Sequence, residues 1–464
     1  MSEPVYKNRY VILAIVLTGI FMSVLDGIVV SIALPTITQY FNVPVALSQW
    51  TITAYLVTMT SLLLIFGKVS EFTGKKSLFM TGLAVFTASS LACGLAPGMN
   101  ELIAFRITQA MGAAMMFGIS GAIIYQVFPI SERGKSMGMI GATVAIGSIA
   151  GPVLGGLLVD SLGWEYIFLI NVPIGLVLLG AAFVGLKFDD FKSGKLEMDW
   201  IGAVTLIIAM VSLMMLLGDL AESQSITPAL ITLSLTLVAA SVTFIYRESR
   251  YHKPLLDLSI FSVKKFTLPT ISMIMYFVAN FMLSIVGPFY FQGVMGLSPT
   301  QVGLLYLLNP AIMVVASPLM GMVYDKHHFK YYAAIGMIIS AIALALMGYL
   351  CTNMDWTLMI IAFVLTGIGG AIYQSPNNTE IMNALPKQKA GIASSVTATA
   401  RNLGMALGVA VASILVSIQL SMAGYSGSIL EADGVVLSGT ISNVIYIAAF
   451  LCILGAIAAA MRNA

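Results

Sequence analysis

The segment GKVSEFTGKKSLFMTG, at Gly67–Gly82, returns in altered form as GMVYDKHHFKYYAAIG, at Gly321–Gly336. The two copies share matched positions at one spacing: Gly67 with Gly321, Val69 with Val323, Glu71 with Asp325, Lys76 with Lys330, and Gly82 with Gly336. Further on, PISERG at Pro129–Gly134 and PKQKAG at Pro386–Gly391 match at nearly the same spacing. Two matches in the same order indicate that the chain contains a duplicated unit.

Long apolar stretches flank both copies of this segment. The 464-residue chain is 59% hydrophobic and only 9% charged, whereas soluble domains contain about 25% charged residues. A helix that crosses a bilayer needs roughly 20 mostly apolar residues, because lipid offers no partner for an unpaired backbone group. Fourteen such windows are present, near residues 10–34, 46–66, 77–96, 101–123, 136–159, 166–186, 200–218, 228–246, 267–291, 300–322, 331–351, 356–384, 391–418 and 440–461. The sequence therefore predicts an all-α integral membrane protein with fourteen transmembrane helices.

Basic residues are confined to alternate loops between these windows. All but two of the 22 Lys and Arg lie before the first window, after the last, or in every second loop, and the other loops hold none. Because loops rich in Lys and Arg stay in the cytoplasm, both termini are predicted to be cytoplasmic, which requires an even number of spans. The first window is too long for the core of a signal peptide and is expected to remain in the protein. We expect a monomeric, multi-pass protein of the plasma membrane.

The duplicated unit also predicts the domain organisation. Six windows end near Lys187, but the spacing between the two copies is longer than six helices need, and the surplus falls at about 188–256. We predict an N-terminal six-helix half at 1–187, a peripheral two-helix insert at 188–256 and a C-terminal six-helix half at 257–464. Parallel six-helix repeats that hold substrate between them near the bilayer midplane are a recurring transporter design.

Four stretches resemble one known transporter family. GKVSEFTGKK resembles the cytoplasmic loop signature of the major facilitator superfamily, although Glu71 stands where Asp is usual. Three more stretches resemble the fourteen-helix drug/proton antiporter family within this superfamily: LDGIVVSIALP at Leu25–Pro35, WEYIFLINVPIG at Trp164–Gly175 and ARNLGMALGVA at Ala400–Ala410. That resemblance implies multidrug efflux and antibiotic resistance. The resemblance covers essentially the whole chain, and it implies transport by alternating access between two six-helix halves.

Four ionisable side chains fall inside the predicted spans, and they are the candidates for proton coupling: Asp26, Arg106, Glu380 and Arg401. A charge at membrane depth costs at least a few kcal/mol, so such residues are functional candidates by default. The three histidines all lie in predicted cytoplasmic loops. A relay of imidazoles within the membrane is therefore excluded.

Asp26 and Arg106 are predicted to lie at similar depth. At the rise of an α-helix, Asp26 is roughly 12 Å and Arg106 about 8 Å below the outer ends of their spans. Burial and a neighbouring Arg act in opposite directions on the pKa of a carboxyl group, so Asp26 could exchange a proton for a cationic substrate. The alternative is that Asp26 only pairs with Arg106 or caps a neighbouring helix.

The segment YQSPNNTEIMNALP, at Tyr373–Pro386, is unusually polar for a span. Its polar side chains cannot all face lipid, so they either line a water-filled cavity or bond across to the next helix. Glu380 lies only about 8 Å from the cytoplasmic end and could instead form a solvated pair with Arg401. The predicted substrate-binding residues are Asp26, Tyr373, Gln374, Asn377 and Asn378.

Glycines mark the expected moving parts. Gly147, Gly151 and Gly155 recur every four residues and permit close helix approach, and with Pro152 they resemble the motif of exporters in the superfamily. In the duplicated loop, Gly67 and Gly74 permit tight turning. The resemblance implies that this loop is a latch, whereas a basic loop that only sets the topology is the alternative. The predicted gating residues are Gly67, Glu71, Gly74, Lys75, Asp325, Gly147, Gly151, Pro152 and Gly155.

These features favour a proton-coupled antiporter that exports amphipathic, cationic compounds. We expect the proton gradient to supply the energy without a cofactor or metal, and the partners to be a lipophilic cation, protons and the lipid bilayer, with no nucleic acid. Export of lipids, siderophores or metabolites is an alternative, and a non-transporting membrane sensor is an alternative of another class. We expect no enzyme, because no Ser/His/Asp arrangement, metal set or nucleotide-binding loop occurs in the sequence.

Overall fold

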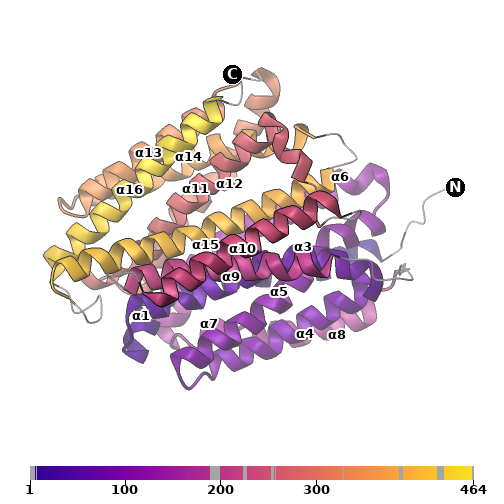
Figure 1. The fold of residues 1–464 in the computed structure, drawn as a ribbon, viewed down its shortest axis with the longest axis horizontal. Helices are drawn as coiled ribbons and strands as arrows, with labels where there is room; N and C mark the ends of the chain where they lie inside the picture. The colour runs from indigo at the N-terminus through magenta and orange to yellow at the C-terminus, as the bar shows by residue number, and fades with distance from the viewer. Residues whose placement is uncertain are drawn as a thin grey trace.

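The computed structural model describes residue 6 and residues 8–188, 199–222, 227–251, 255–256, 258–327, 329–385, 390–425 and 433–461. These residues form helices and connecting turns, and no strand occurs among them. The long helices run side by side as one bundle (Figure 1). The expected all-α class is confirmed for the described chain.

The helices before residue 188 form the N-terminal set. They are α1 (Arg9–Phe41), α2 (Val45–Ser48), α3 (Trp50–Thr73), α4 (Lys75–Gly94), α5 (Met99–Val127), α6 (Ile130–Ser161), α7 (Tyr166–Leu169) and α8 (Asn171–Gly185). Within this set α5 packs against α3 and α4, while α1 packs against α6, α5 and α8. Asn42 follows α1 in the left-handed conformation, with φ of 49°, and ends that helix.

The helices after residue 257 form the C-terminal set. They are η1 (Leu258–Ser262), α11 (Lys264–Phe289), η2 (Tyr290–Val294), α12 (Pro299–His327), α13 (Tyr332–Leu350), α14 (Trp356–Asn383), α15 (Ala390–Met422) and α16 (Gly434–Met461). Here α13 packs against α14 and α16, and α11 packs against α15 and α16. The two sets meet chiefly where α6 contacts α12 and where α3 contacts α15.

Two helices lie between these sets in the sequence, α9 (Trp200–Glu222) and α10 (Pro228–Arg250). They pack against each other, and α9 also contacts α15 and α3. In Figure 1 the pair lies in front of the bundle, along the boundary between the two sets. Leu235, Val238 and Val242 of α10 are exposed. The predicted domain boundaries adjoin residues outside the described ranges, so the division at 187 and 256 stays a prediction.

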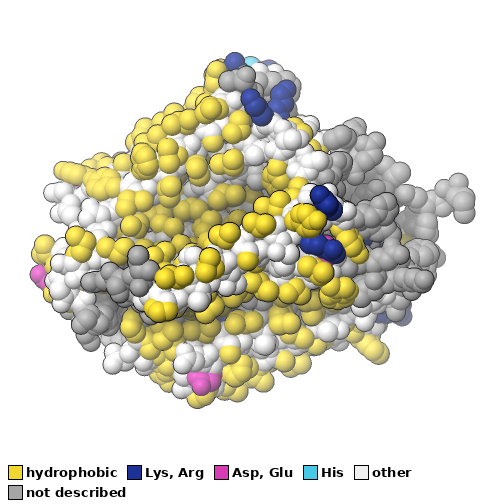
Figure 2. Space-filling model, viewed as in Figure 1, with side chains coloured by type: hydrophobic (Ala, Val, Ile, Leu, Met, Phe, Trp, Pro, Cys, Tyr) yellow, Lys and Arg dark blue, Asp and Glu magenta, His cyan; other side chains and the backbone are white. Residues whose placement is uncertain are grey.

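Among the residues that the structure describes, twelve helices are long and apolar enough to cross a membrane. The sequence predicted fourteen, and the two that do not qualify are α3 and α6. The described apolar part of α6 is Ala150–Ser161, and several side chains of α3 and α6 lie outside what the structure describes. Along one face of the molecule, apolar side chains cover the middle and Lys and Arg gather toward one end (Figure 2).

The duplication seen in the sequence has a counterpart in helix packing. A Cβ added at Gly112 would lie 2.6 Å from the carbonyl oxygen of Gly82, where α4 and α5 cross. A Cβ added at Gly369 would lie 2.9 Å from the carbonyl oxygen of Gly336, where α13 and α14 cross. Only glycine permits such close backbone approach. We therefore treat Gly112 and Gly369 as equivalent positions when the two sets are compared.

Candidate functional site

Asp26 lies in the middle of α1, and its side chain is completely buried within the N-terminal set. Its Oδ2 atom forms an ion pair with the guanidinium group of Arg106. Its Oδ1 atom accepts hydrogen bonds from the side-chain amides of Gln109 at 2.9 Å and Asn171 at 3.0 Å. Side chains from α5 and α8 therefore converge on one carboxylate of α1.

Arg106 is equally buried, and it has partners besides Asp26. Nε donates to the backbone oxygen of Thr51 at 2.8 Å, and Nη1 donates to Oε1 of Gln109 at 2.6 Å. The guanidinium carbon lies 4.1 Å from the centre of the Tyr55 ring. Charge-assisted hydrogen bonds and a cation–π contact together stabilise a cation that water does not reach.

Sequence reasoning predicted the Asp26–Arg106 pair but missed two of its partners, Gln109 and Asn171. Gln109 lies three residues after Arg106, which places both side chains on the same face of α5. Asn171 is the only side-chain amide in the apolar window near 166–186. An amide in such a window was a signal of the same kind as Asp26, because an unpaired polar group in lipid is costly.

The opposite face of α1 packs against α6 through the glycines that the sequence singled out. A Cβ added at each glycine would lie very close to a side chain of α1. The distances are 3.0 Å from Gly147 to Val24, 2.8 Å from Gly151 to Ile28 and 2.7 Å from Gly155 to Val29. Asp26 lies two residues from both Val24 and Ile28, so it points away from α6. The glycines therefore hold α1 from one side while the ionic network holds it from the other.

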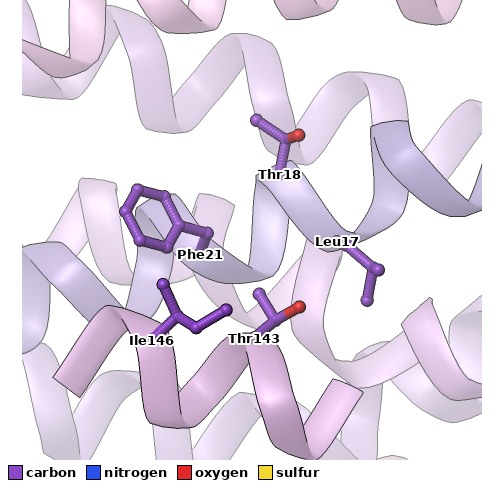
Figure 3. Close-up of a pocket in the computed structure, with 5 residues that line it drawn as sticks. All are labelled: Leu17, Thr18, Phe21, Thr143 and Ile146. Carbon is purple, nitrogen blue, oxygen red and sulfur yellow. The ribbon is translucent and has the colours of Figure 1, made fainter. Parts of the chain in front are cut away.

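A small open pocket of about 200 Å³ lies farther along the same contact between α1 and α6, lined by Leu17, Thr18, Phe21, Thr143 and Ile146. Phe21 and Ile146 reach toward each other from the two helices (Figure 3). Both hydroxyl groups donate to carbonyl oxygens of their own helices, Thr18 to Ala14 and Thr143 to Met139. The pocket therefore offers apolar contact, and no residue of the Asp26 network lines it.

The polar segment of α14 makes contacts within the C-terminal set. Tyr373 is buried and stacks on Tyr276 of α11, with ring centres 4.6 Å apart. Gln374 donates to the Tyr276 hydroxyl at 3.4 Å, and Asn377 donates to the backbone oxygen of Pro269 at 3.1 Å. These side chains therefore bond between helices, but toward α11 and not, as expected, toward the next helix, α15. The water-filled cavity stays a prediction.

Glu380 and Arg401 are not joined as the sequence suggested. Glu380 accepts a hydrogen bond at 2.8 Å from the hydroxyl of Tyr324, on α12. Arg401 lies against Phe277, with its guanidinium carbon 5.5 Å from the ring centre. Glu380 lies three residues before the end of α14, whereas Arg401 lies eleven residues into α15, and the Glu380 side chain is turned toward α12. The predicted solvated pair is therefore wrong for this conformation.

The duplicated loop after α3 is a tight turn. Gly74 joins α3 to α4 with φ of 92°, a conformation that favours glycine. Lys75 donates to the Gln126 side chain at 2.8 Å and so ties the start of α4 to the end of α5. Gly67 has open space around its Cα. The side chains of Glu71 and Asp325 lie outside what the structure describes, so their role in a latch stays a prediction.

The N-terminal and C-terminal sets are hydrogen-bonded to each other at the end of the bundle that carries α2. Thr300 of α12 donates to the carboxylate of Asp160 at 3.0 Å and lies 3.3 Å from the carbonyl oxygen of Gly156. Gln292 donates to the carbonyl oxygen of Ile32 at 3.2 Å. Pro152 also takes part, because its carbonyl oxygen leaves no room for a Cβ at Gly303. The α2 end is thus closed by contacts between α6 and α12 and between η2 and α1.

A family model described as Major Facilitator Superfamily matches residues 16–409 and, in a second match, residues 269–462. The chain belongs to this superfamily. The riboflavin transporter RibZ of Clostridioides difficile is 32% identical over 407 residues, which cover 87% of each chain. Multidrug resistance protein 3 of Bacillus subtilis is 30% identical, over 87% of this chain and 79% of its own. The expected superfamily and transporter class are therefore confirmed.

Solved structures agree with this fold at low sequence identity. A bacterial homologue of the human lysosomal transporter Spinster superposes with a TM-score of 0.69 at 13% identity, covering 99% of this chain and 98% of the other. A POT family transporter gives the same TM-score at 14% identity. The protein is thus a membrane transporter of the major facilitator fold, with small molecules as substrates and a lipid bilayer as its environment.

Proposed function

We propose that the protein is a proton-coupled antiporter of the drug/proton type, which exports amphipathic compounds from the cytoplasm by alternating access. The observation that carries the proposal is the complete burial of Asp26, an acid held by Arg106, Gln109 and Asn171. Intramembrane acids are costly, and proton relays are a principal reason to keep them. The proton gradient is then the energy source, and no cofactor is needed.

The geometry supports proton carriage by Asp26 more than cation binding by Asp26. All the hydrogen-bond donors around the carboxylate come from the protein itself, so an incoming cation would have to displace Arg106. A proton needs no such space. When the two halves rearrange, a change in the contact with Arg106 would alter the balance between the charged and the neutral carboxyl group. Glu380, partnered by Tyr324 in this conformation, and Arg401 remain candidates for coupling in the other half.

We also propose that α3 and α6 cross the membrane, which restores fourteen spans. α3 has 24 residues and α6 has 32, about 36 Å and 48 Å at the helical rise, which exceeds a 30 Å hydrocarbon core. α3 packs along α5 and α15, and α6 packs along α1 and α12, all of them candidate spans. The alternation of basic loops then places both termini in the cytoplasm and the α2 end outside.

In that orientation the hydrogen bonds of Thr300 and Gln292 lie at the outer side of the membrane. The conformation is then closed to the outside. Alternating access requires these contacts to break while new ones form at the other end, where the duplicated loops lie. The repeated architecture supports such a movement, because two similar halves can rock about a site between them.

A second substrate class, planar aromatic metabolites, stands beside multidrug efflux. Three of the relatives named as multidrug proteins and one named as a riboflavin transporter are similarly close to this chain. In support of the aromatic class, the partly exposed ring of Phe277 adjoins the stacked rings of Tyr276 and Tyr373, so a flat substrate has an aromatic ring to pack on. Lipophilic cations remain the first expectation from the sequence.

The test is uptake into inside-out proteoliposomes with an imposed pH gradient. Ethidium and riboflavin are the two probes, one a planar cation and one a neutral planar compound. We expect the wild type to accumulate at least one of them only when the lumen is acidic, and Asp26→Asn to lose this dependence. The matched control is Asp355→Asn, the same change at an exposed helix cap. Uptake that ignores the gradient in the wild type would contradict the proposal.

A further inference from the structure

Of the two intramembrane arginines, Arg106 has a counter-ion, whereas Arg401 has none among the residues that the structure describes. It lies eleven residues into α15, about 16 Å from the helix start, and its side chain is partly exposed. Its guanidinium makes no hydrogen bond or ion pair with any residue that the structure describes, and its Nε atom is buried without a partner. A cation at this depth without an acceptor is costly, so an acceptor from outside the chain would stabilise it.

A cation–π contact of Arg401 leads into an aromatic row. Its guanidinium lies against the ring of Phe277, and Phe277 meets Tyr276 edge to face, with centres 5.4 Å apart. Tyr276 in turn stacks on Tyr373. Phe277 is partly exposed, whereas Tyr276 and Tyr373 are buried behind it. The arrangement is a guanidinium beside a partly exposed ring, which adjoins two stacked, buried rings.

Further polar atoms without partners occur on the same three helices, within about a turn and a half of this row. They are Oγ of Ser272 on α11, Oδ1 of Asn378 on α14 and Oγ1 of Thr399 on α15. Each buried polar atom left without a hydrogen bond costs about 1–3 kcal/mol. α11, α14 and α15 contact one another, so a polar group that enters between them has these atoms as partners.

The fold does not require an arginine at this position. Arg401 lies three residues before Gly404, which approaches Phe277 of α11. In the N-terminal set, Gly147 makes the corresponding approach to α1, and three residues before it stands Val144. The same packing is thus achieved with an apolar side chain. The arginine of α15 therefore serves a purpose beyond helix packing.

We propose that Arg401 and Phe277 form a subsite for the acceptor-bearing end of a planar aromatic substrate. The guanidinium donates to carboxylate, phenolate or carbonyl oxygens of that substrate, because its planar fork matches such groups. The ring of Phe277 receives the flat apolar part of the substrate. This inference rests on the proposed transport function, and it replaces the lipophilic cation by a neutral or anionic aromatic compound, since an unpaired guanidinium repels a cation.

The test is equilibrium binding to the full-length protein in detergent, with three planar fluorescent probes that differ in charge. Fluorescein carries anionic oxygens, riboflavin carries neutral carbonyl groups, and ethidium is a cation. We expect Arg401→Met to weaken fluorescein and riboflavin at least about tenfold and to leave ethidium unchanged or tighter. Arg401→Lys should retain most of the fluorescein affinity, which needs the charge, and lose more of the riboflavin affinity, which needs the fork.

The outcomes separate this inference from the proposed function. Equal weakening of all three probes, or no weakening of any, would overturn the subsite, and so would wild-type protein that binds only ethidium. If Arg401→Met fails to fold, as judged by gel filtration and melting temperature, the comparison of Arg401→Lys with Arg401→Gln gives the same discrimination. Binding needs no pH gradient, so the binding result does not depend on whether uptake in proteoliposomes is proton-coupled. Likewise, a failure of the binding test leaves the uptake result unchanged.

Discussion

At equivalent positions, the first half of the repeat has charged side chains and the second half has apolar side chains. Arg106 lies six residues before Gly112, and Phe363 lies six residues before Gly369, the glycine of the equivalent crossing. Asp26 lies nine residues before Pro35 of α1, and Ala279 lies nine residues before Pro288 of α11. An acid and a base in the first half thus correspond to two apolar residues in the second.

Each half fills this position in its own manner. Phe363 packs edge to face with Tyr306, at 5.4 Å between ring centres, and lies 6.1 Å from the ring of Phe291. The second half shows that a helix pair of this design packs well without charges. The Asp26–Arg106 pair is therefore not a requirement of the fold, which strengthens the interpretation that it is kept for proton coupling.

The largest effect is expected from removing one partner of the pair. Arg106→Phe introduces the residue of the second half but leaves Asp26 buried without its counter-ion, which costs about 3–5 kcal/mol. We expect a large drop in melting temperature in detergent. Adding Asp26→Ala should recover much of the loss, because both positions then match the second half, yet coupling should remain absent. A double variant no more stable than Arg106→Phe would show that the two halves are not interchangeable in packing.

A smaller effect is expected from the amide donors. Gln109→Leu removes a donor to Asp26 and an acceptor for Arg106, and we expect a loss of about 1–3 kcal/mol in folding free energy with impaired proton-driven transport. The matched control is Thr366→Val, at the equivalent position of α14, whose hydroxyl donates to the Phe363 carbonyl of its own helix and accepts from the Asn309 amide of α12 at 3.3 Å, with no charged partner among the described residues. Denaturation by heat and gradient-driven uptake measure the two effects. Similar transport defects in both variants would contradict the assignment of coupling to the first half.

The contacts that join the halves allow a third prediction. Thr300→Val removes the hydrogen bond to Asp160, which at about 1 kcal/mol corresponds to roughly a fivefold shift in the population of the closed α2 end. Spin labels near Lys75 and Lys330 should show two distances, one for each conformation. Thr300→Val should increase the share of the distance that belongs to the conformation with an open α2 end. Thr352→Val is the control, because that hydroxyl donates only within its own turn. A single distance in every variant and at every pH would argue against alternating access.

The smallest effect is expected in the two-helix insert. Asp199 accepts hydrogen bonds from Arg247 at 3.1 Å and 3.2 Å, which join the start of α9 to the end of α10. Burial raises the pKa of the Asp199 carboxyl group, but the bonds from Arg247 and from the Gly202 N–H outweigh it and hold that pKa below its ordinary value. Its stabilising contribution is therefore present above the unfolded pKa and is lost as the pH falls through the folded pKa.

Asp199→Asn should consequently lower the melting temperature slightly at neutral pH and make no difference in strong acid. Thermal melts across that pH range provide the measurement. Transport should be unaffected, because the insert contributes no residue to the Asp26 network. A transport defect as large as that of Gln109→Leu would place the insert in the mechanism.

Sequence reasoning succeeded where depth alone decides the outcome. Asp26 and Arg106 were predicted to meet because the helical rise places them at the same level, and both face the interior of the first half. It failed for Glu380 and Arg401, since these residues lie at different distances from the adjoining ends of α14 and α15, and Glu380 turns toward Tyr324 of α12. The windows at α3 and α6 are not among the twelve candidate spans of the described chain, and both helices include side chains that the structure does not describe. Asn171 was visible in the sequence as a lone amide and was overlooked.

The most direct test of the central claim is proton release from purified protein in weakly buffered detergent when substrate is added. Fluorescein, riboflavin and ethidium are the substrates to try, and wild type is compared with Asp26→Asn. Asn keeps the size of Asp26 and can still hydrogen-bond, but it cannot titrate. The account predicts that at least one compound releases protons from the wild type and none from Asp26→Asn, while Asp355→Asn behaves as the wild type. Undiminished release from a folded Asp26→Asn protein would show that Asp26 is a structural partner of Arg106 and that coupling resides elsewhere.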